Sequence, residues 1–165
     1  MVNIREAQLS DLQDLTNIYN WAVLNTTATF DLVEQTLEQR KTWFDQHKGN
    51  HPLIVAEYNG GVIGYSCLST FREKQAYSKT SELSVYIHPA FHNKSIGTQL
   101  LEEIIKRGQQ LGYHNIIAGI TSDNEISIHM HEKAGFKKCG CFKEVGFKFE
   151  RWLDVVFYEL LLEVV

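Results

Sequence analysis

The sequence predicts an α/β (α+β) protein, because β-rich and helical patterns follow one another without a repeat or a linker. Two β-rich runs, 53–58 and 62–69, flank the turn segment "NGG", which is a strong signal for an antiparallel hairpin. Residues 81–87 alternate apolar and polar side chains, as a strand with one buried face does. A small-residue loop containing Gly97 then leads into an amphipathic helical pattern.

The other elements follow from the same kinds of pattern. Ser10 is a good N-cap for the first helix, and Gly112 is suited to end the helix that follows the Gly97 loop. The expected helices cover 10–22, 34–47, 97–111 and 125–135. The other expected strands cover 2–6, 115–121, 136–145 and 152–162.

Length, charge and composition restrict the classes of protein. The 165 residues, 44% of them hydrophobic, fit one domain over 1–165 with a sizeable core. With 16 basic against 20 acidic residues and no basic block, the charge of −4 predicts no nucleic-acid partner. The N-terminus lacks a secretory pattern, and no apolar run approaches the roughly 18 residues that span a bilayer. We therefore expect a cytoplasmic protein with no membrane partner that binds a small metabolite.

The cysteines and histidines do not predict a metal site. Cys67, Cys139 and Cys141 are too few for a disulfide framework and lack zinc-ligand spacing. His129 and His131 lie in a pattern whose apolar period favours a helix, where residues two apart point about 200° apart and cannot share an ion.

The segment "HPAFHNKSIGTQLL" (88–101) has two interpretations. A strand, a small-residue turn and Gly97 at a helix start would direct the N–H groups of 93–98 toward one point, where the helix dipole also favours an anion. The alternative is a plain strand-to-helix connection, since no Walker-type Gly-Lys-Ser/Thr is present.

Several ordered motifs carry a resemblance to a known family. The loop "HNKSIG" is similar to the Q/R-x-x-G-x-G/A pyrophosphate loop of the GNAT superfamily of acetyl-CoA-dependent N-acetyltransferases, with His92 and Ser95 as departures. Over nearly the whole chain, "IYNWAVLNTTATFD", "FREKQAYSKTSELSVYIHP", "HEKAGF" and "VGFKFERWLDVV" resemble the phosphinothricin acetyltransferase-like family. The resemblance implies a GNAT fold with a central mixed, mostly antiparallel, splayed β-sheet flanked by helices, and a homodimer.

The same resemblance implies the site residues. Glu82 corresponds to the family's general base, acting directly or through water, and His131 to its general acid. Without the resemblance, Glu82 reads as a solvated strand residue and His131 as a helix-surface or satisfied core histidine. The residues expected to bind acetyl-CoA are Val85, Tyr86, Ile87, His92, Asn93, Lys94, Ser95, Ile96, Gly97, Thr98, Asn124 and Ser127. Those expected to bind the acceptor are Phe30, Phe71, Arg72, Lys74, Tyr77 and Lys148.

These residues predict transfer of acetyl from acetyl-CoA to the α-amine of a small amino-acid-like molecule of the phosphinothricin, methionine sulfone or methionine sulfoximine type. Arg72 and Lys74 beside aromatic rings suit a carboxylate or phosphinate on an apolar chain. Direct transfer in a ternary complex is expected, although Cys67 is in principle a nucleophile. The alternatives are an acyl-CoA-binding sensor or interaction module with little turnover, and acetylation of a simple amine or peptide N-terminus.

Overall fold

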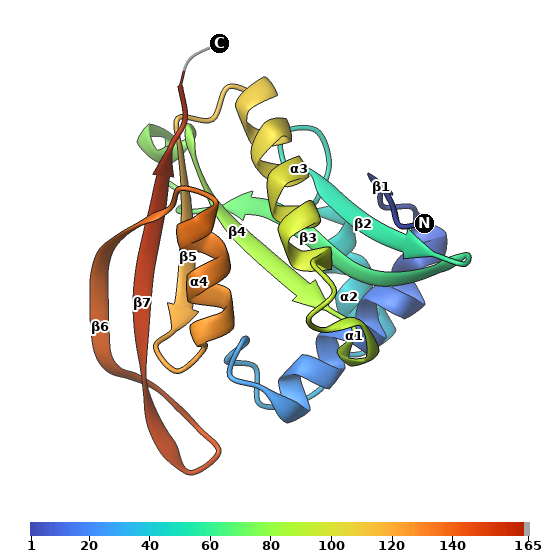
Figure 1. Cartoon of the computed structure of the whole chain (residues 1–165), viewed down its shortest axis with the longest axis horizontal. Coiled ribbons are helices and arrows are strands. Elements are labelled where there is room, and N and C mark those ends of the chain that lie inside the picture. Colours follow the sequence, from blue (N-terminus) through green and yellow to red (C-terminus); the bar gives the residue numbers. More distant parts are fainter. Residues whose placement is uncertain (164–165) are drawn as a thin grey trace.

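A seven-stranded sheet runs through the middle of the molecule (Figure 1). The computed structural model describes residues 1–163, so the last two residues of the predicted domain lie outside the described part. The strands are β1 (Asn3–Glu6), β2 (Leu53–Tyr58), β3 (Gly61–Thr70), β4 (Thr80–Ile87), β5 (Asn115–Thr121), β6 (Lys137–Lys148) and β7 (Arg151–Leu161). Their order is β1-β2-β3-β4-β5-β7-β6, and only the β4–β5 pair is parallel. The expected mixed, mostly antiparallel sheet is therefore confirmed.

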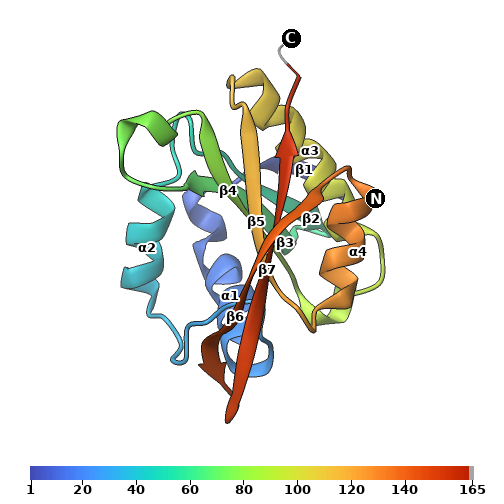
Figure 2. The same cartoon turned by 90° about the vertical axis from the view of Figure 1, so that its left-hand side faces the viewer.

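Helices cover both faces of the sheet. The α-helices are α1 (Leu12–Asn25), α2 (Leu37–Asp45), α3 (Ile96–Gln110) and α4 (Glu125–Lys133), and short 3₁₀ turns cover Leu9–Asp11, Gln75–Tyr77 and Pro89–Phe91. Figure 2 shows α1 and α2 on one side of the sheet and α3 and α4 on the other. Within residues 1–163, no helix combines the length and apolar character needed to cross a membrane.

The core consists of two clusters, one on each face, because strand side chains alternate in direction. In β2, Ile54 packs in the cluster that contains Leu100 and Ile104 of α3. The next residue, Val55, packs in the cluster that contains Leu15 and Ile18 of α1. All six side chains are at most 2% exposed. The sheet is therefore held between two apolar layers, and a site in it must open where the strands separate.

The strands separate between β4 and β5. Their parallel pairing covers only Thr80 with Asn115, Ser81 with Ile116 and Glu82 with Ile117. Beyond these pairs β4 continues to Ile87 and β5 to Thr121 without pairing with each other. Figure 1 shows the two arrows pointing apart. The backbone of β4 after Glu82 thus has an unpaired edge toward the opening, which is the splay that the sequence led us to expect.

Two helix starts differ from the sequence-based prediction. Ser10 lies inside the first 3₁₀ turn, and α1 begins at Leu12, because the buried Asp11 carboxylate accepts the Gln8 N–H at 2.7 Å and pairs with Arg5 at 2.8 Å. Helix α2 begins at Leu37 instead of residue 34, after a capping box in which the Thr36 hydroxyl accepts the Gln39 N–H. Both corrections come from side-chain caps just upstream of the apolar pattern.

The last two strands form one long hairpin, which the sequence-based boundaries missed. Strand β6 extends to Lys148 and β7 begins at Arg151, so the turn consists of Phe149 and Glu150, both with positive φ (54° and 58°). Glu144 also has positive φ (49°), within a break in the β6–β7 register. Trp152 is 62% exposed on this hairpin. Neither left-handed turn residue is a glycine or asparagine, so the usual hairpin signal is missing.

Candidate active site

A groove of about 800 Å³ runs along the sheet opening between α1, β4, the start of α3 and α4. Every residue that the sequence predicted for the cosubstrate lines it: Val85, Tyr86, Ile87, His92, Asn93, Lys94, Ser95, Ile96, Gly97, Thr98, Asn124 and Ser127. The structure therefore brings together three segments that are up to about forty residues apart in the chain.

The loop before α3 has the geometry of an anion site. Asn93 and Ser95 both adopt left-handed backbone conformations, with φ of 61° and 59°. The N–H groups of residues 93–98 make no hydrogen bond to the described residues, because the loop and first turn have no partner upstream. Alternating left-handed residues direct successive N–H groups toward the same concave surface. The positive end of the α3 dipole also favours an anion there. These features favour the anion-binding interpretation of the segment.

The two departures from the family loop, His92 and Ser95, differ in their contacts. Ser95 takes the left-handed conformation despite its Cβ, and its hydroxyl caps nothing. The His92 imidazole donates Nε2–H to the Ile87 carbonyl at 3.0 Å and packs edge-on against Trp21. His92 thereby fixes the loop to the end of β4. Gly97 is needed for helix packing, because a Cβ there would lie 2.8 Å from the sulfur of Met130.

Helix α4 forms the opposite wall of the groove. Asn124 caps this helix, its side-chain oxygen accepting the Ser127 N–H at 3.2 Å. Asn124 and Ser127 line both the groove and a second pocket, so the two cavities join beside them. Within the apolar stripe of α4, Met130 packs against the core, whereas Ile126 is 74% exposed in the groove. The stripe therefore divides between the core and the ligand groove.

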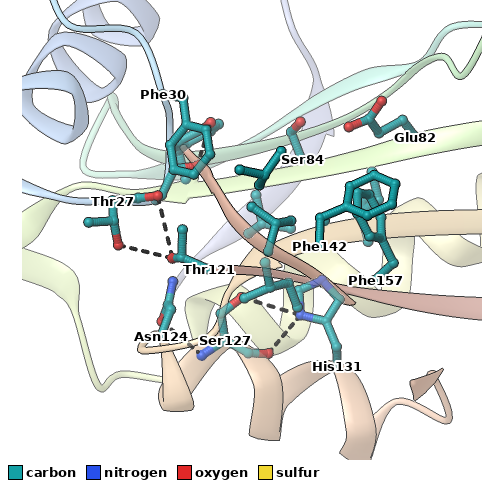
Figure 3. A pocket seen from close by; sticks show the side chains of 18 residues that line it. Thr27, Phe30, Glu82, Ser84, Thr121, Asn124, Ser127, His131, Phe142 and Phe157 are labelled. Carbon is teal, nitrogen blue, oxygen red and sulfur yellow. Dashed lines mark hydrogen bonds between the residues drawn. The ribbon is translucent and has the colours of Figure 1, made fainter. Parts of the chain in front are cut away.

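The second pocket, of about 400 Å³, lies between β4, β5, α4 and the β6–β7 hairpin. Figure 3 shows Glu82 and Ser84 of β4 on one side and His131 of α4 on the other, with Phe142 and Phe157 of the hairpin between them. Val85 and Tyr86 line this pocket as well as the groove. The arrangement places a carboxylate and an imidazole around a space that opens directly into the cosubstrate groove.

Glu82 is the last residue of β4 that pairs with β5. Its side chain shares a face with Ser84 and Tyr86, opposite Leu83, as the alternation predicted. The side chain stays open to a ligand, yet the protein around it displaces water, and this desolvation raises the pKa of the carboxyl above its ordinary value. A carboxylate with a raised pKa is a better proton acceptor near neutral pH.

His131 is buried in the wall of the pocket, 4% exposed, and its ring packs edge-on against Phe136. Its Nδ1 lies 2.7 Å from the Ser127 carbonyl oxygen, which only accepts, so Nδ1 carries the proton. Burial lowers the pKa of the imidazole below its ordinary value, and the neutral ring therefore has a free lone pair on Nε2. The proton donor that the family resemblance implies requires the imidazolium, which this environment disfavours.

Two residues expected to bind the acceptor, Phe30 and Lys148, lie where the β6–β7 hairpin meets the segment after α1. Phe30 lines the pocket and packs against Gly146 so closely that a Cβ at position 146 would overlap its ring. Lys148 is 4% exposed, and its ammonium donates to the Thr29 carbonyl at 2.8 Å. Lys148 therefore attaches the hairpin to the Phe30 segment, and the structure gives it no contact with the pocket.

The remaining acceptor residues form an exposed cluster in the loop before β4. The Arg72 guanidinium lies over the rings of Phe71 and Tyr77, 5.1 and 5.6 Å from their centroids. Lys74 precedes the short 3₁₀ turn of this loop. None of the four lines the pocket that holds Glu82, but the loop ends at Thr80, where β4 begins.

Neither a nucleophilic thiol nor a metal ion is supported by the site. Cys67 is 2% exposed on β3, and burial raises the pKa of its thiol to about 11, so it carries no thiolate at neutral pH. Among residues 1–163, no group of three or more His, Cys, Asp or Glu side chains is arranged to hold a metal ion.

Sequence reasoning missed part of the pocket wall. Ser84 follows Glu82 at the strand period and was detectable from the alternation already noted. Thr121 belongs to the end of β5 that does not pair with β4, and its hydroxyl is 2.9 Å from that of Thr27. Phe142 and Phe157 come from the hairpin, whose crossing over the opening leaves no local signal in the sequence.

The fold has two neighbouring cavities at the sheet opening, an arrangement that suits an enzyme transferring a group between two substrates. Residues 4–157 match the GNAT acetyltransferase domain. The methionine sulfoximine/methionine sulfone acetyltransferase of Salmonella typhimurium is 37% identical over 163 residues, covering 98% of this chain and 95% of that protein. The phosphinothricin N-acetyltransferase of Streptomyces coelicolor is 35% identical over 162 residues, 96% of this chain and 95% of that one.

A solved structure agrees with these relatives. The phosphinothricin acetyltransferase of Sinorhizobium meliloti, in complex with acetyl-CoA, has a TM-score of 0.94 and 37% identity, covering 98% of this chain and 88% of that chain. The chain belongs to the GNAT family of acetyltransferases. The family resemblance expected from the sequence is thereby confirmed.

Proposed function

We propose that the chain, as one domain over 1–165, transfers acetyl from acetyl-CoA to the α-amine of a small amino-acid-like substrate. The methionine sulfoximine, methionine sulfone and phosphinothricin types named for its relatives are the acceptors we expect. The observation that carries this proposal is that Val85, Tyr86, Asn124 and Ser127 line both the groove and the pocket that Glu82 also lines.

The groove suits acetyl-CoA along its whole length. Its pyrophosphate would accept hydrogen bonds from the N–H groups of residues 93–98, and Lys94 adds a positive charge. The amide groups of its arm match the unpaired edge of β4 after Glu82, with Asn124 on the other side. Its thioester then reaches the junction of the cavities, where an acceptor in the second pocket can attack.

The reaction requires two proton movements, for which the pocket has two groups. We propose that the Glu82 carboxylate takes the first proton from the acceptor ammonium, directly or through water. The free amine attacks the thioester carbonyl carbon, and the nitrogen becomes positively charged. The neutral His131 accepts that second proton on Nε2 and passes it to the sulfur as the C–S bond breaks. In this scheme His131 is an acid only after it has served as a base.

The acceptor would be oriented by its acidic and apolar parts. We propose that the exposed Arg72 and Lys74 bind its carboxylate near the Glu82 end of β4, with Phe71 and Tyr77 beside its chain. Phe30 covers the pocket from the other side. Lys148 contributes by holding the Phe30 segment, since its ammonium is already bonded to Thr29.

We also propose that two copies of the chain form a homodimer in the cytoplasm, where acetyl-CoA is available. Support for the dimer comes from the hairpin, because β6 is an edge strand and the β6–β7 hairpin carries large apolar side chains that are at least half exposed. They are Phe142, Val145, Phe147, Phe149 and Trp152. Sedimentation equilibrium tests this proposal, and a monomer at assay concentrations would contradict it.

A panel of free amino acids, their analogues, polyamines and short peptides tests the proposed activity by thiol release from acetyl-CoA. We expect the highest kcat/KM for amino acids of the methionine sulfone or phosphinothricin type. Preference for a simple amine or a peptide N-terminus would replace the proposed acceptor. Binding of acetyl-CoA in calorimetry without thiol release for any member would indicate a sensor instead of an enzyme.

A further inference from the structure

A charged side chain outside the described pocket is almost completely buried. Arg40 of α2 is 2% exposed, and its guanidinium carbon lies 3.6 Å from the Trp43 ring centroid and 4.2 Å from that of Tyr19. Two aromatic rings thus hold the planar group in one orientation. An arginine that only solvated the surface of the nine-residue helix α2 would instead be exposed to water.

The positive charge of Arg40 has no negative partner among residues 1–163. Its one hydrogen bond runs from a terminal nitrogen to the Tyr65 hydroxyl at 3.2 Å, and Nε has no partner. No carboxylate lies within 4.0 Å, and the nearby Asp31 accepts from Tyr19 and from Gln35. A buried cation without a counter-ion is costly, so the site is incomplete without an anion.

The guanidinium lines a cleft of about 380 Å³ between α2 and the sheet. Gln35, Gln39 and Gln46 also line this cleft, together with Ser84 and Tyr86 of β4. Ser84 and Tyr86 also line the pocket that holds Glu82, so the cleft and that pocket share a wall.

The strand register relates Arg40 to the proposed base. Tyr65, Cys67 and Ser69 of β3 lie opposite Tyr86, Ser84 and Glu82 of β4, all on one face of the sheet. Glu82 and Ser84 are therefore about 7 Å apart along the strand. Arg40 contacts Tyr65, which pairs with Tyr86, the residue two positions beyond Ser84 on β4. A small extended molecule can have one end at Glu82 and the other in the cleft.

We propose that Arg40 binds an anionic group at the end of the acceptor remote from its α-amine. The proposal rests on the proposed function and assigns the specificity for acidic acceptors to this cleft. A guanidinium held by two rings presents parallel N–H groups to a carboxylate or phosphinate, and the glutamine amides add neutral donors. Arg72 is left to bind the α-carboxylate near the loop.

Phosphinothricin and methionine sulfone form a matched pair of acceptors for the test. Both end in a methyl-bearing tetrahedral centre with two oxygens, but only the phosphinate is negatively charged. We expect Arg40→Met to reduce kcat/KM for phosphinothricin by roughly 10- to 150-fold, the usual effect of losing a charge-assisted hydrogen bond. For methionine sulfone the reduction should be several-fold smaller, with the KM for acetyl-CoA unchanged. Lys106→Met, on the exposed side of α3, controls for net charge and should affect neither acceptor.

Equal losses for both acceptors would overturn the proposal, since they would mean that Arg40 supports the fold or binds the α-carboxylate. If Arg40→Met does not fold, Arg40→Lys keeps the charge and should retain part of the preference for phosphinothricin; an unchanged preference would contradict bidentate binding. Should the unmodified protein acetylate neither acceptor, the proposed function fails. Anion binding at Arg40 is then tested by the fluorescence of Trp43, on which the guanidinium stacks. This fluorescence should change on addition of phosphinothricin and not on addition of methionine sulfone.

Discussion

Replacing Glu82 by glutamine tests the proposed base with little change in shape. The amide cannot accept the ammonium proton, so kcat should fall by about 10²-fold or more, the usual contribution of a general base. This loss equals about 2.7 kcal/mol of transition-state stabilisation. The raised pKa of Glu82 makes the expected loss larger than for an ordinary solvated carboxylate, because the stronger base lies closer to neutral pH.

The pH dependence distinguishes catalysis from structure. Above the pKa of the acceptor amine, the free base is abundant and the deficit of Glu82→Gln should shrink. In the unmodified enzyme, kcat/KM should fall as the pH drops through the raised Glu82 pKa. In Glu82→Gln this decrease of kcat/KM at low pH should be absent. A raised carboxyl pKa also means that the folded state loses stability as the pH rises, so the variant should be at least as stable as the parent at neutral pH.

The assay is steady-state thiol release with methionine sulfone at neutral pH and above the amine pKa. Acetyl-CoA affinity, measured by calorimetry, should not change. Glu73→Gln, an exposed glutamate in the neighbouring loop, is a matched charge control and should keep full activity. A deficit that is uniform across pH, or an equal deficit in the control, would refute the assignment of Glu82 as the base.

The other predictions address the remaining parts of the site. Ser95→Gly should preserve or tighten acetyl-CoA binding in calorimetry, because glycine favours the left-handed conformation; Gly97→Val should weaken it severely, and no loss would favour a plain turn. Arg72→Ala should lower kcat/KM for methionine sulfone by roughly 10- to 150-fold with an unchanged KM for acetyl-CoA, whereas a silent variant would remove the loop from recognition. Cys67→Ala should keep most of the activity, since the thiol is buried and protonated, and an inactive folded variant would reopen a covalent route. The lowered pKa of His131 makes the unfolded chain bind more protons, so urea unfolding should show stability falling as the pH drops below about 6.5, and His131→Phe should reduce that loss.

The anion-binding loop of the groove could be predicted from the sequence because its residues are contiguous. The N–H groups of 93–98 belong to one loop, and the strand, loop and helix around it each have a local signature. Alternation likewise separated Glu82 from Leu83. The sequence identified Ser95 only as a departure from the loop motif, and the structure shows that it has a positive φ without a side-chain cap.

The rest of the site depends on long-range packing, which has no local pattern. Phe142 reaches the pocket only because the β6–β7 hairpin turns at Phe149 and Glu150, neither of which is a usual turn residue. Arg40 looks like an ordinary charged helix residue in the sequence, and only the contacts with Trp43 and Tyr19 reveal that it is buried.

The most direct test of the proposed activity is to identify the product by NMR. The protein is mixed with acetyl-CoA and methionine sulfone, and the acetyl group is followed as the thioester is consumed. We predict that it appears on the α-nitrogen of methionine sulfone in an amount equal to the CoA released. Acetate formed in place of the acetylated amino acid, or acetyl-CoA that stays bound and intact, would contradict the proposal that this protein is an amino-acid N-acetyltransferase.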